Sequence, residues 1–392
     1  MEMKTAAKTL TVGLAPIDWW LDAIGSDCGS NSDVRAGLVD VYKRHLPRYG
    51  EIIFTGACAY SCKHCIYGAN FASANQSLPP ATWQKLFSNI HKDLGIETFV
   101  YGGRSISSPG IETLAALKHA LPKAKVGVID NGISYVPFKE KLLNLKLDWI
   151  DISVDGQEQD HDAQRGKPGG YQETLRGAEW LLQNRVSPKI NILSCLTSIN
   201  RGSLIQMIRD LSAKGFPNFF ITPVAFAEGI RPDPHLRVPG SDFARFVDEL
   251  IEALPTFEDV WVELILSAAD SLADILNAHA DMIESFSADG DSLVFHMRAK
   301  SNLDKNVYNE FFIRYSPLSL TGTRELIINT NGDVIVPKSV ATGEVLSESV
   351  VGNLNRQSVS GIVSGIGLTD SFEYYVNELF NEQQLLSDFF RR

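Results

Sequence analysis

Residues 51–65 read EIIFTGACAYSCKHC, and this stretch decides the fold. Its first residues are rich in isoleucine and phenylalanine, which predicts a buried β-strand that runs directly into three cysteines. Cys58, Cys62 and Cys65 are spaced C-x3-C-x2-C, with no fourth cysteine close by. Structural zinc sites and most iron–sulfur clusters take four protein ligands. The triplet therefore predicts a metal centre with one open coordination position.

The residues that follow continue as strand–helix units. From about residue 51 to 254, six runs rich in β-branched residues alternate with segments of helical periodicity. The predicted strands are EIIFT (51–55), ETFVYGG (97–103), KVGVIDNG (125–132), DWIDISVDG (148–156), KINILSCLT (189–197) and FFITPVAF (219–226). Six such units predict a parallel sheet with right-handed crossovers. A complete eight-fold barrel takes about 250 residues, so this α/β chain is expected to form a partial (β/α)6 TIM-like barrel.

The last part of the chain has a different character. Three runs are expected to be strands in an antiparallel setting: DVWVELIL (259–266), SLVFHMRAK (292–300) and NEFFIRYSPL (309–318). The stretch RELIINTNGDVIVP predicts a hairpin that turns at Asn331-Gly332, and residues 371–390 predict an amphipathic helix. The expected parts are an N-terminal extension (1–50), the barrel (51–254) and an appended α+β module (255–392).

Composition excludes several function classes. The formal net charge is −11, which disfavours a surface that follows nucleic-acid phosphates. The N-terminus lacks the basic and apolar regions of a secretory signal, and no run of 18 apolar residues is present to span a membrane. Five cysteines, three of them crowded, do not form a disulfide framework. These features predict a cytoplasmic protein.

A zinc site completed by His64 or a distant ligand is the alternative to an iron–sulfur cluster. His64 lies between two cysteines of one tight loop and cannot easily turn onto the same ion. No C-x2-C or H-x3-H partner motif occurs elsewhere in the chain. The loop follows the first strand, so it is expected at the carboxyl face, where barrel enzymes place their chemistry.

Cys58, Cys62, His64 and Cys65 together resemble the C-x3-C-x-Φ-C signature of the radical S-adenosylmethionine (radical SAM) superfamily, in which Φ is usually aromatic. The resemblance implies one [4Fe–4S] cluster held by three cysteines. S-adenosylmethionine would bind the open iron and be cleaved to a 5′-deoxyadenosyl radical that takes hydrogen from a substrate. The open coordination position would then be the cofactor's site.

Further residues carry the same resemblance after later strands. The family's Gly-Gly-Glu corresponds to Gly102, Gly103 and Arg104, so the glycines match and a base replaces the acid. Asn131 stands where relatives often have Thr-Asn-Gly, although a turn alone can explain an Asn-Gly pair.

Beyond the fourth strand, Ser153 and Asp155 are expected on one face, as a patch that contacts the cofactor. The stretch HDAQRG resembles the His-Asp-x-x-Arg-Gly of one branch, which implies that Arg165 grips the cofactor carboxylate. A loop salt bridge is the alternative role of Arg165, and strand-end capping that of Ser153 and Asp155.

The C-terminal part resembles the SPASM or twitch extension of that branch, but without its auxiliary-cluster cysteines. The hairpin, Pro337, Gly352 and Asn353 match, whereas no cysteine follows Cys195. A single cluster leaves no separate acceptor for a substrate electron, which favours a redox-neutral reaction such as epimerisation or rearrangement. Cys195 and Cys28 are the candidate hydrogen donors, and a core position is the simpler role for Cys195.

The expected substrate is a small polar metabolite or natural-product intermediate, with an electron donor such as flavodoxin or ferredoxin and no nucleic-acid or membrane partner. About 50 residues precede the first strand, fewer than a leader-binding domain needs. Peptide modification and dehydrogenation remain alternatives. Two further hypotheses are a catalytically silent relative and a zinc-binding structural protein. Tail residues that could reach a substrate are Glu263, Arg314, Tyr315, Glu325 and Lys338.

Overall fold

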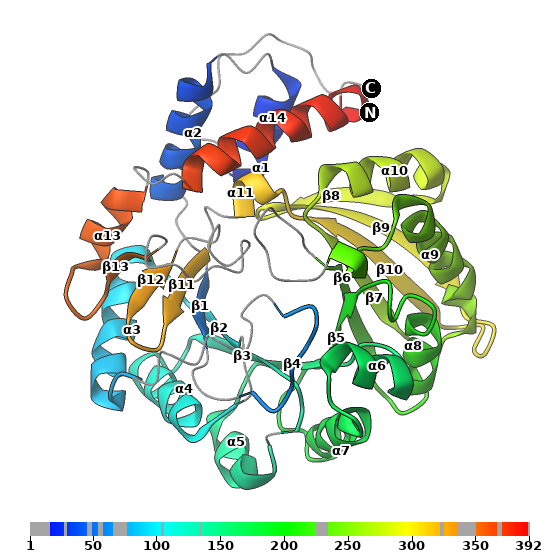
Figure 1. Cartoon of the computed structure of the whole chain (residues 1–392), viewed down its shortest axis with the longest axis horizontal. Helices are drawn as coiled ribbons and strands as arrows, with labels where there is room; N and C mark the ends of the chain where they lie inside the picture. The colour runs from blue at the N-terminus through cyan, green and yellow to red at the C-terminus, as the bar shows by residue number, and fades with distance from the viewer. Residues whose placement is uncertain are drawn as a thin grey trace.

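A single mixed sheet organises the chain in the computed structural model (Figure 1). The described residues are 16–26, 30–44, 49–53, 58–65, 77–102, 106–133, 135–224, 234–321, 325–335, 350–366 and 371–390. Their strands are β1 (Tyr49–Ile53), β2 (Thr98–Gly102), β3 (Lys125–Asp130), β4 (Trp149–Ser153), β5 (Ile190–Leu196), β6 (Asn218–Pro223), β7 (Trp261–Leu266), β8 (Ser285–Asp289), β9 (Ser292–Lys300), β10 (Tyr308–Tyr315), β11 (Glu325–Asn329), β12 (Asp333–Ile335) and β13 (Val350–Asn353). They follow the order β13-β12-β11-β1-β2-β3-β4-β5-β6-β7-β10-β9-β8. The two outermost of these strands do not pair, so the described sheet is an open barrel, as the sequence predicted.

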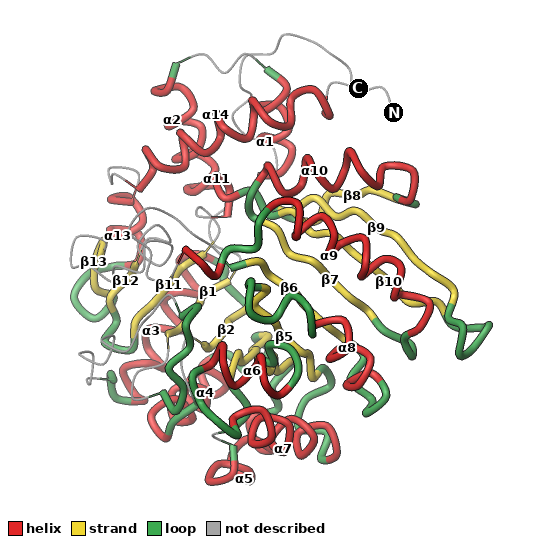
Figure 2. The backbone as a smooth tube through the Cα atoms, turned by 45° about the vertical axis from the view of Figure 1, so that its right-hand side comes forward, coloured by secondary structure: helices red, strands yellow, loops and turns green. Residues whose placement is uncertain are grey.

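Helices cover the outer side of the curved sheet (Figures 1 and 2). They are α3 (Pro80–Leu94), α4 (Ser108–Ala120), α5 (Lys139–Leu145), α6 (Glu158–Arg165), α7 (Gly170–Gln183), α8 (Leu204–Ser212), α9 (Gly240–Ala253) and α10 (Ala269–His279). Strand β4 shows how the layers arise. Its isoleucines Ile150 and Ile152 are fully buried in the core, while Asp151 and Ser153 alternate to the opposite face of the strand.

The parallel part of the sheet extends further than the sequence suggested. The expected antiparallel setting is wrong for residues 259–266, because β7 pairs in parallel with both β6 and β10. For residues 309–318 it holds on one side, because β10 pairs antiparallel with β9 and in parallel with β7. Strand β11 likewise pairs in parallel with β1. Only the pairs β10–β9, β9–β8, β11–β12 and β12–β13 are antiparallel. The direction of β7 follows from α9, which lies between β6 and β7 in the sequence. A helical crossover between neighbouring strands makes them parallel.

Two predicted elements of the C-terminal part are confirmed. Strands β11 and β12 form the hairpin, and Gly332 in its turn has φ +87°, a conformation that glycine adopts without a steric penalty. Residues 371–390 form helix α14 (Ser371–Phe390). The sheet continues past residue 254, where the barrel was expected to end. The division into three parts stays a prediction.

Helices from both ends of the chain lie between the two edges of the sheet (Figure 1). These helices are α1 (Pro16–Gly25), α2 (Asn31–Arg44), α11 (Leu318–Thr321) and α14, whereas α13 (Val359–Ile366) lies beside β13 at one edge. Helix α14 contacts α1, α2, α10 and α11, while α13 contacts α3 and β13. Among the described elements, helices rather than further strands lie between the two edges of the sheet.

One buried carboxyl group holds this helical closure together. Glu382 of α14 is 2% exposed and accepts hydrogen bonds from the indole of Trp20 at 2.9 Å and the hydroxyl of Tyr315 at 3.0 Å. The hydroxyl of Ser319 donates to the same carboxyl. Burial raises the pKa of Glu382 to about 7, although these three donors oppose the rise.

Within the described residues, no helix is long and apolar enough to cross a membrane.

Candidate active site

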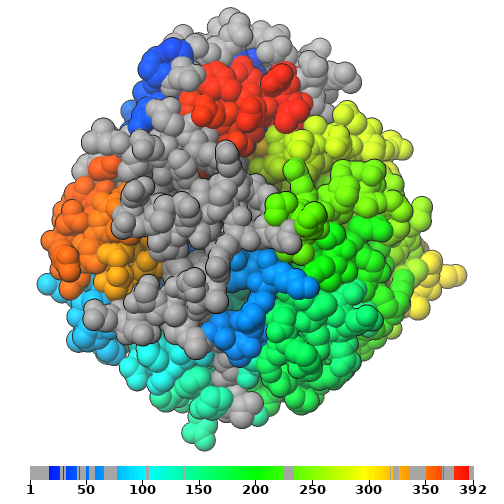
Figure 3. Space-filling model, viewed as in Figure 1, coloured from blue at the N-terminus to red at the C-terminus, as the bar shows by residue number. Residues whose placement is uncertain are grey.

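The cysteine segment, residues 58–65, is anchored to the end of helix α6. The backbone N–H of Ser61 donates to the carbonyl of Arg165 at 3.1 Å, and that of Lys63 donates to the carbonyl of Gln164 at 2.9 Å. These carbonyls belong to the last turn of α6, which leaves its C=O groups without partners inside the helix. The helix end thus fixes the backbone on which the thiols are carried. Figure 3 shows the segment, in blue, on the face viewed in Figure 1.

Glycines allow the segment to approach α6 and α7 closely. Gly166 ends α6 with φ +66°, and a Cβ there would lie 2.7 Å from the carbonyl oxygen of Ser61. A Cβ on Gly170 would lie 2.7 Å from the ring of Tyr60. The Tyr60 hydroxyl donates to the Gly170 carbonyl at 3.0 Å and also bonds the hydroxyl of Thr174 at 2.7 Å. Any side chain at either glycine would push the cysteine segment outward.

The three cysteines form no disulfide with any described residue, and all are partly buried. Burial raises the pKa of Cys62 to about 12, Arg165 opposes the rise, and Asp155 and the other two thiols add to it. Without a cation, Cys62 is therefore a protonated thiol, whereas bound iron would deprotonate it.

The geometry does not support the zinc alternative. Thiolates around one tetrahedral zinc ion lie about 3.8 Å apart, as follows from a Zn–S distance near 2.3 Å. Among the residues that the structure describes, no three His, Cys, Asp or Glu side chains are placed to hold a single metal ion. A cluster binds each thiolate through a different iron atom, so it accepts a wider spacing.

Asn131 lies beside the cysteines. It is 5% exposed, and its amide nitrogen is 3.8 Å from the sulfur of Cys58. Its backbone carbonyl accepts a hydrogen bond from Thr174 at 2.7 Å, and its side-chain oxygen accepts the N–H of Ile133 at 3.1 Å. The amide is thus held in place and can donate to sulfur.

A buried ion pair lies under the segment. Asp155 is fully buried, and its Oδ2 accepts a hydrogen bond from Nε of Arg165 at 2.7 Å. Its Oδ1 accepts the backbone N–H of Cys195 at 2.8 Å. Burial disfavours the Asp155 anion, but Arg165, with smaller contributions from His64 and His161, outweighs this and lowers its pKa. Both oxygens serve the protein, so Asp155 positions Arg165 here.

Arg165 keeps its terminal nitrogens available. It is 7% exposed, and Nε is its only hydrogen-bonding nitrogen among contacts with the described residues. Its guanidinium carbon lies 5.6 Å from the centre of the Tyr60 ring. The two Nη groups can therefore donate in parallel to a carboxylate beside the cysteines.

Two histidines flank the pair, and only His64 was selected from the sequence. Burial lowers the pKa of His64 to about 4, its Nε2 lies 3.8 Å from Oδ2 of Asp155, and its buried Nδ1 has no partner in the described structure. His161 accepts the backbone N–H of Asp155 on Nδ1 at 3.1 Å, so its proton lies on Nε2. Burial also lowers the pKa of His161 to about 4. Both rings are neutral.

Cys195 lies near the carboxyl end of β5 and is partly buried. Burial raises the pKa of its thiol well above the usual range, and Asp155 adds to this. Its backbone carbonyl accepts hydrogen bonds from the amides of Gln164 at 2.9 Å and Asn200 at 2.8 Å. The strand end next to the Asp155–Arg165 pair is thus rigidly held.

Two of the other predicted residues lie at strand ends, and several lie outside the described part of the chain. Gly102 ends β2, where a Cβ would lie 3.3 Å from Cβ of Ile129, and Ser153, 9% exposed, ends β4. Several predicted residues lie outside the described part of the chain: Cys28, Gly103, Arg104, Pro337 and Lys338.

Glu263 and Arg314 form an ion pair, and Asp289 is a second partner of Arg314 at 2.9 Å. Tyr315 bonds Glu382 in the helical closure.

Sequence reasoning missed Tyr60 and His161 as parts of the site. Tyr60 lies inside the cysteine triplet, and His161 opens the quoted HDAQRG stretch, so both stood next to selected residues. Tyr60 contacts Gly170, 110 residues further along the chain. His161 accepts the backbone N–H of Asp155, just after strand β4. No local pattern records such contacts.

A family model described as the Radical SAM superfamily matches residues 52–211. This range contains the cysteine segment, Asn131, the Asp155–Arg165 pair and Cys195. The superfamily uses a [4Fe–4S] cluster and S-adenosylmethionine.

Curated relatives match parts of the chain. The pre-heme d1 synthase of Dinoroseobacter shibae is 22% identical over 44% of this chain and 42% of its own length. The sporulation killing factor maturation protein SkfB of Bacillus subtilis is 26% identical over 36% of this chain and 33% of its own. The AdoMet-dependent heme synthase of Methanosarcina barkeri is 25% identical over 52% and 57%. The chain thus matches less than two thirds of the length of each.

Solved structures share the fold over most of the chain. The structure of anSMEcpe with bound AdoMet and a Cp18Cys peptide has a TM-score of 0.57 at 14% identity, covering 85% of this chain and 83% of that one. Streptococcus suis SuiB bound to its precursor peptide SuiA also has a TM-score of 0.57, at 13% identity and 86% and 71% coverage. The family match identifies a radical SAM domain at residues 52–211, and the fold agreement with these solved structures extends over most of the chain.

Proposed function

We propose that this protein is a radical SAM enzyme that binds one [4Fe–4S] cluster through Cys58, Cys62 and Cys65. The observation that carries the proposal is the cysteine segment: three cysteines without a disulfide, fixed to the end of α6 beside a buried arginine whose Nη groups bond no described residue. When bound, the cluster supplies the electron that cleaves S-adenosylmethionine.

The surrounding residues fit this pair of cofactors. The Nη groups of Arg165 would hold the cofactor carboxylate, and the amide of Asn131 would donate to a cysteine sulfur. His64 keeps one buried, unpartnered ring nitrogen at the same place. Gly102 and Ser153, at the ends of β2 and β4, are the further proposed contacts.

The test is anaerobic purification and reconstitution. About four iron and four sulfide per chain are expected, and the triple Cys58→Ala, Cys62→Ala, Cys65→Ala variant should bind none. With a strong reductant the wild type should convert S-adenosylmethionine to 5′-deoxyadenosine and methionine. Iron near eight per chain, or a cluster in the triple variant, would contradict ligation by one triplet. A reduced cluster without deoxyadenosine would favour a silent relative.

We further propose a redox-neutral reaction on a small polar metabolite or natural-product intermediate. Residues 196–392 contain no cysteine, so they supply no thiolate for a second cluster that could accept a substrate electron. Epimerisation needs a hydrogen donor, and the buried Cys195 keeps its S–H because burial raises its pKa. After donation, the sulfur would be restored by one electron and one proton from the reductant.

Product mass in deuterated water decides between these reactions. With aminocyclitol, sugar or nucleoside substrates, an epimer carries one solvent deuterium and otherwise keeps the substrate's mass. A product two hydrogens lighter would instead show dehydrogenation. Cys195→Ala should still form deoxyadenosine but release no epimer, and Cys195→Ser is its isosteric control. Epimer formation by Cys195→Ala would exclude this donor and leave Cys28 as the other candidate.

Peptide modification is the second candidate, supported by SkfB, a maturation protein, and by the peptide-bound structures of the same fold. Precursor-like peptides belong in the same assay, and a mass change on a peptide would favour this alternative. In either case we propose a cytoplasmic enzyme with a flavodoxin or ferredoxin as electron donor.

A further inference from the structure

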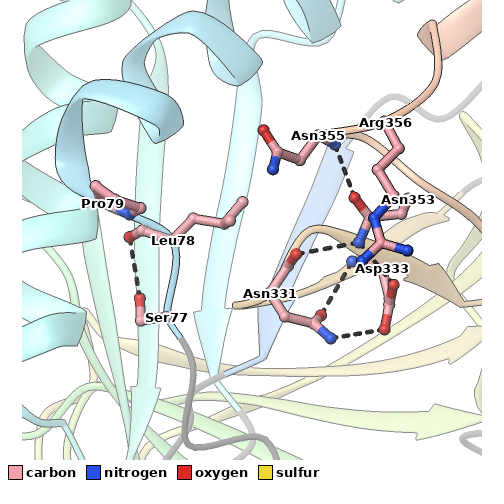
Figure 4. Close-up of a pocket in the computed structure, with 8 residues that line it drawn as sticks. All are labelled: Ser77, Leu78, Pro79, Asn331, Asp333, Asn353, Asn355 and Arg356. Atoms are coloured by element: carbon pink, nitrogen blue, oxygen red, sulfur yellow. Dashed lines mark hydrogen bonds between the residues drawn. The ribbon is translucent and has the colours of Figure 1, made fainter.

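A polar cavity of about 680 Å³ lies among three segments that are far apart in the sequence (Figure 4). Its volume is in the range of small-molecule sites. The residues that line it are Ser77, Leu78, Pro79, Asn331, Asp333, Asn353, Asn355 and Arg356. They come from the approach to α3, the turn of the β11–β12 hairpin and the turn after β13.

Hydrogen bonds hold two walls of this cavity in place. The carboxylate of Asp333 accepts from the amide of Asn331 on one oxygen and from that of Asn353 on the other, both at 2.7 Å. The N–H of Leu78 donates to the carbonyl of Thr330 at 2.8 Å, which ties the third segment to the hairpin. The cavity is therefore formed before any ligand arrives.

The remaining polar groups of the cavity are mainly unused donors. The side chains of Asn355 and Arg356 form no hydrogen bond or ion pair with any residue that the structure describes. Figure 4 shows the Asn355 amide extending into the space that faces Leu78, while Arg356 turns down beside Asn353. Among described residues, the hydroxyl of Ser77 contacts only the carbonyl of Leu78, at 3.4 Å. The carboxylate of Asp333, in contrast, already accepts a hydrogen bond on each oxygen, from Asn331 and from Asn353.

We propose that this cavity binds the oxyanion group of a small polar molecule, a phosphate or a carboxylate, with Arg356 as its charged contact. A guanidinium donates in parallel to two oxygens of such a group, and the amide of Asn355 adds a third donor. Leu78 and Pro79 offer an apolar wall for the carbon skeleton of the ligand.

The cavity lies at the edge of the sheet that carries the cysteines. Asn329, the last residue of β11, pairs with Ile53, the last residue of β1, and the cysteine segment follows β1. Asn331 and Asp333 come directly after β11. This placement makes the substrate the natural source of the oxyanion. That identification rests on the proposed function, whereas the binding itself does not.

Calorimetric titration with inorganic phosphate and with citrate, in chloride buffer and without S-adenosylmethionine or reductant, tests the binding. We expect Arg356→Gln to weaken binding at least tenfold and Asn355→Ala to weaken it several-fold. Arg176→Gln, an exposed arginine of α7 outside the cavity, removes the same charge and should bind like the wild type. Phosphate binding alone would identify a phosphate site, and citrate binding alone a carboxylate site.

Two results would overturn the proposal: no binding of either anion to the wild type at millimolar concentration, or equal affinity in the wild type and Arg356→Gln. Equal weakening by Arg176→Gln would show a general charge effect and count against the site as well. Circular dichroism of each variant checks its fold. Formation of deoxyadenosine is measured separately, so failure of anion binding cannot be confused with failure of the proposed function.

Discussion

At the scale of single residues, the Asp155–Arg165 pair determines how the site is built. Both side chains are buried, so each charge depends on the other for compensation. Because the pKa of Asp155 is lowered in the folded protein, the pair stabilises the fold above the ordinary carboxyl pKa near 4. This contribution is lost as the pH falls through the lowered value.

Removing one partner of this pair should be costly. Arg165→Ala leaves a buried carboxylate, and we expect the free energy of unfolding in urea to fall by about 3–5 kcal/mol at pH 7. The double variant Arg165→Ala, Asp155→Asn should lose clearly less than the sum of the two single changes. Arg176→Ala, on the surface of α7, should stay within about 0.5 kcal/mol of the wild type. Additive losses would show that the two side chains do not depend on each other.

The sequence predicted which residues belong to the site better than what each one does. Asp155 and Arg165 were selected as cofactor contacts, but the two carboxylate oxygens of Asp155 accept hydrogen bonds from Arg165 and from the backbone of Cys195. The spacing of residues along a strand shows which side chains share a face. It does not show which hydrogen bonds they prefer, because the partner can come from any neighbouring element. Arg356 was not selected at all, since its cavity exists only after three distant segments meet.

At the scale of elements, the junction between the cysteine segment and α6 is the most sensitive point. Gly166 and Gly169 both have positive φ, +66° and +75°, so alanine at either should cost about 1–2 kcal/mol. Only at Gly166 would the new Cβ meet the backbone of Ser61, whereas nothing lies within 4 Å of a Cβ at Gly169.

These two glycines therefore form a matched pair for experiment. We expect Gly166→Ala to displace the cysteine segment and lower reconstituted iron to less than half of the wild-type amount. Gly169→Ala should show a similar backbone penalty in urea unfolding but keep its iron. Equal iron contents in the two variants would mean that the contact with Ser61 does not position the thiols.

Element types were predictable, but the direction of some strands was not. Alternating apolar residues identify residues 259–266 as a strand, and the same alternation occurs in parallel and antiparallel sheets. The direction of β7 depends on α9, which returns the chain to the starting edge of the sheet. The β11–β12 hairpin was predictable because an Asn-Gly turn defines a pairing between neighbours in the sequence.

At the scale of the whole molecule, Glu382 connects the helical closure to the sheet. The raised pKa means that the folded protein binds a proton more tightly than the unfolded chain between about pH 4.5 and 7. Stability from this group therefore falls as the pH rises through that range. The difference between the two pKa values corresponds to a loss of about 3 kcal/mol above pH 7.

Glu382→Gln should remove this slope; its amide oxygen can still accept from Trp20, while its NH2 group can donate to the hydroxyl of Tyr315. The measurement is urea unfolding at several pH values between 4.5 and 8, compared as the difference between variant and wild type. The difference should grow in favour of the variant as the pH rises. Glu252→Gln, an exposed change on α9, should give a difference that does not vary with pH. A difference between Glu382→Gln and the wild type that stays constant with pH would show that folding does not raise the pKa of this carboxyl group.

The bond between Trp20 and Glu382 also sets an order of events during synthesis. The two residues are 362 positions apart, and a ribosome adds about 5–20 residues per second. Helix α1 thus waits roughly 20–70 s for the helix that will cover it. During that time the indole N–H of Trp20 lacks its carboxyl partner, whereas Trp19 can already pack against Gly37 of α2.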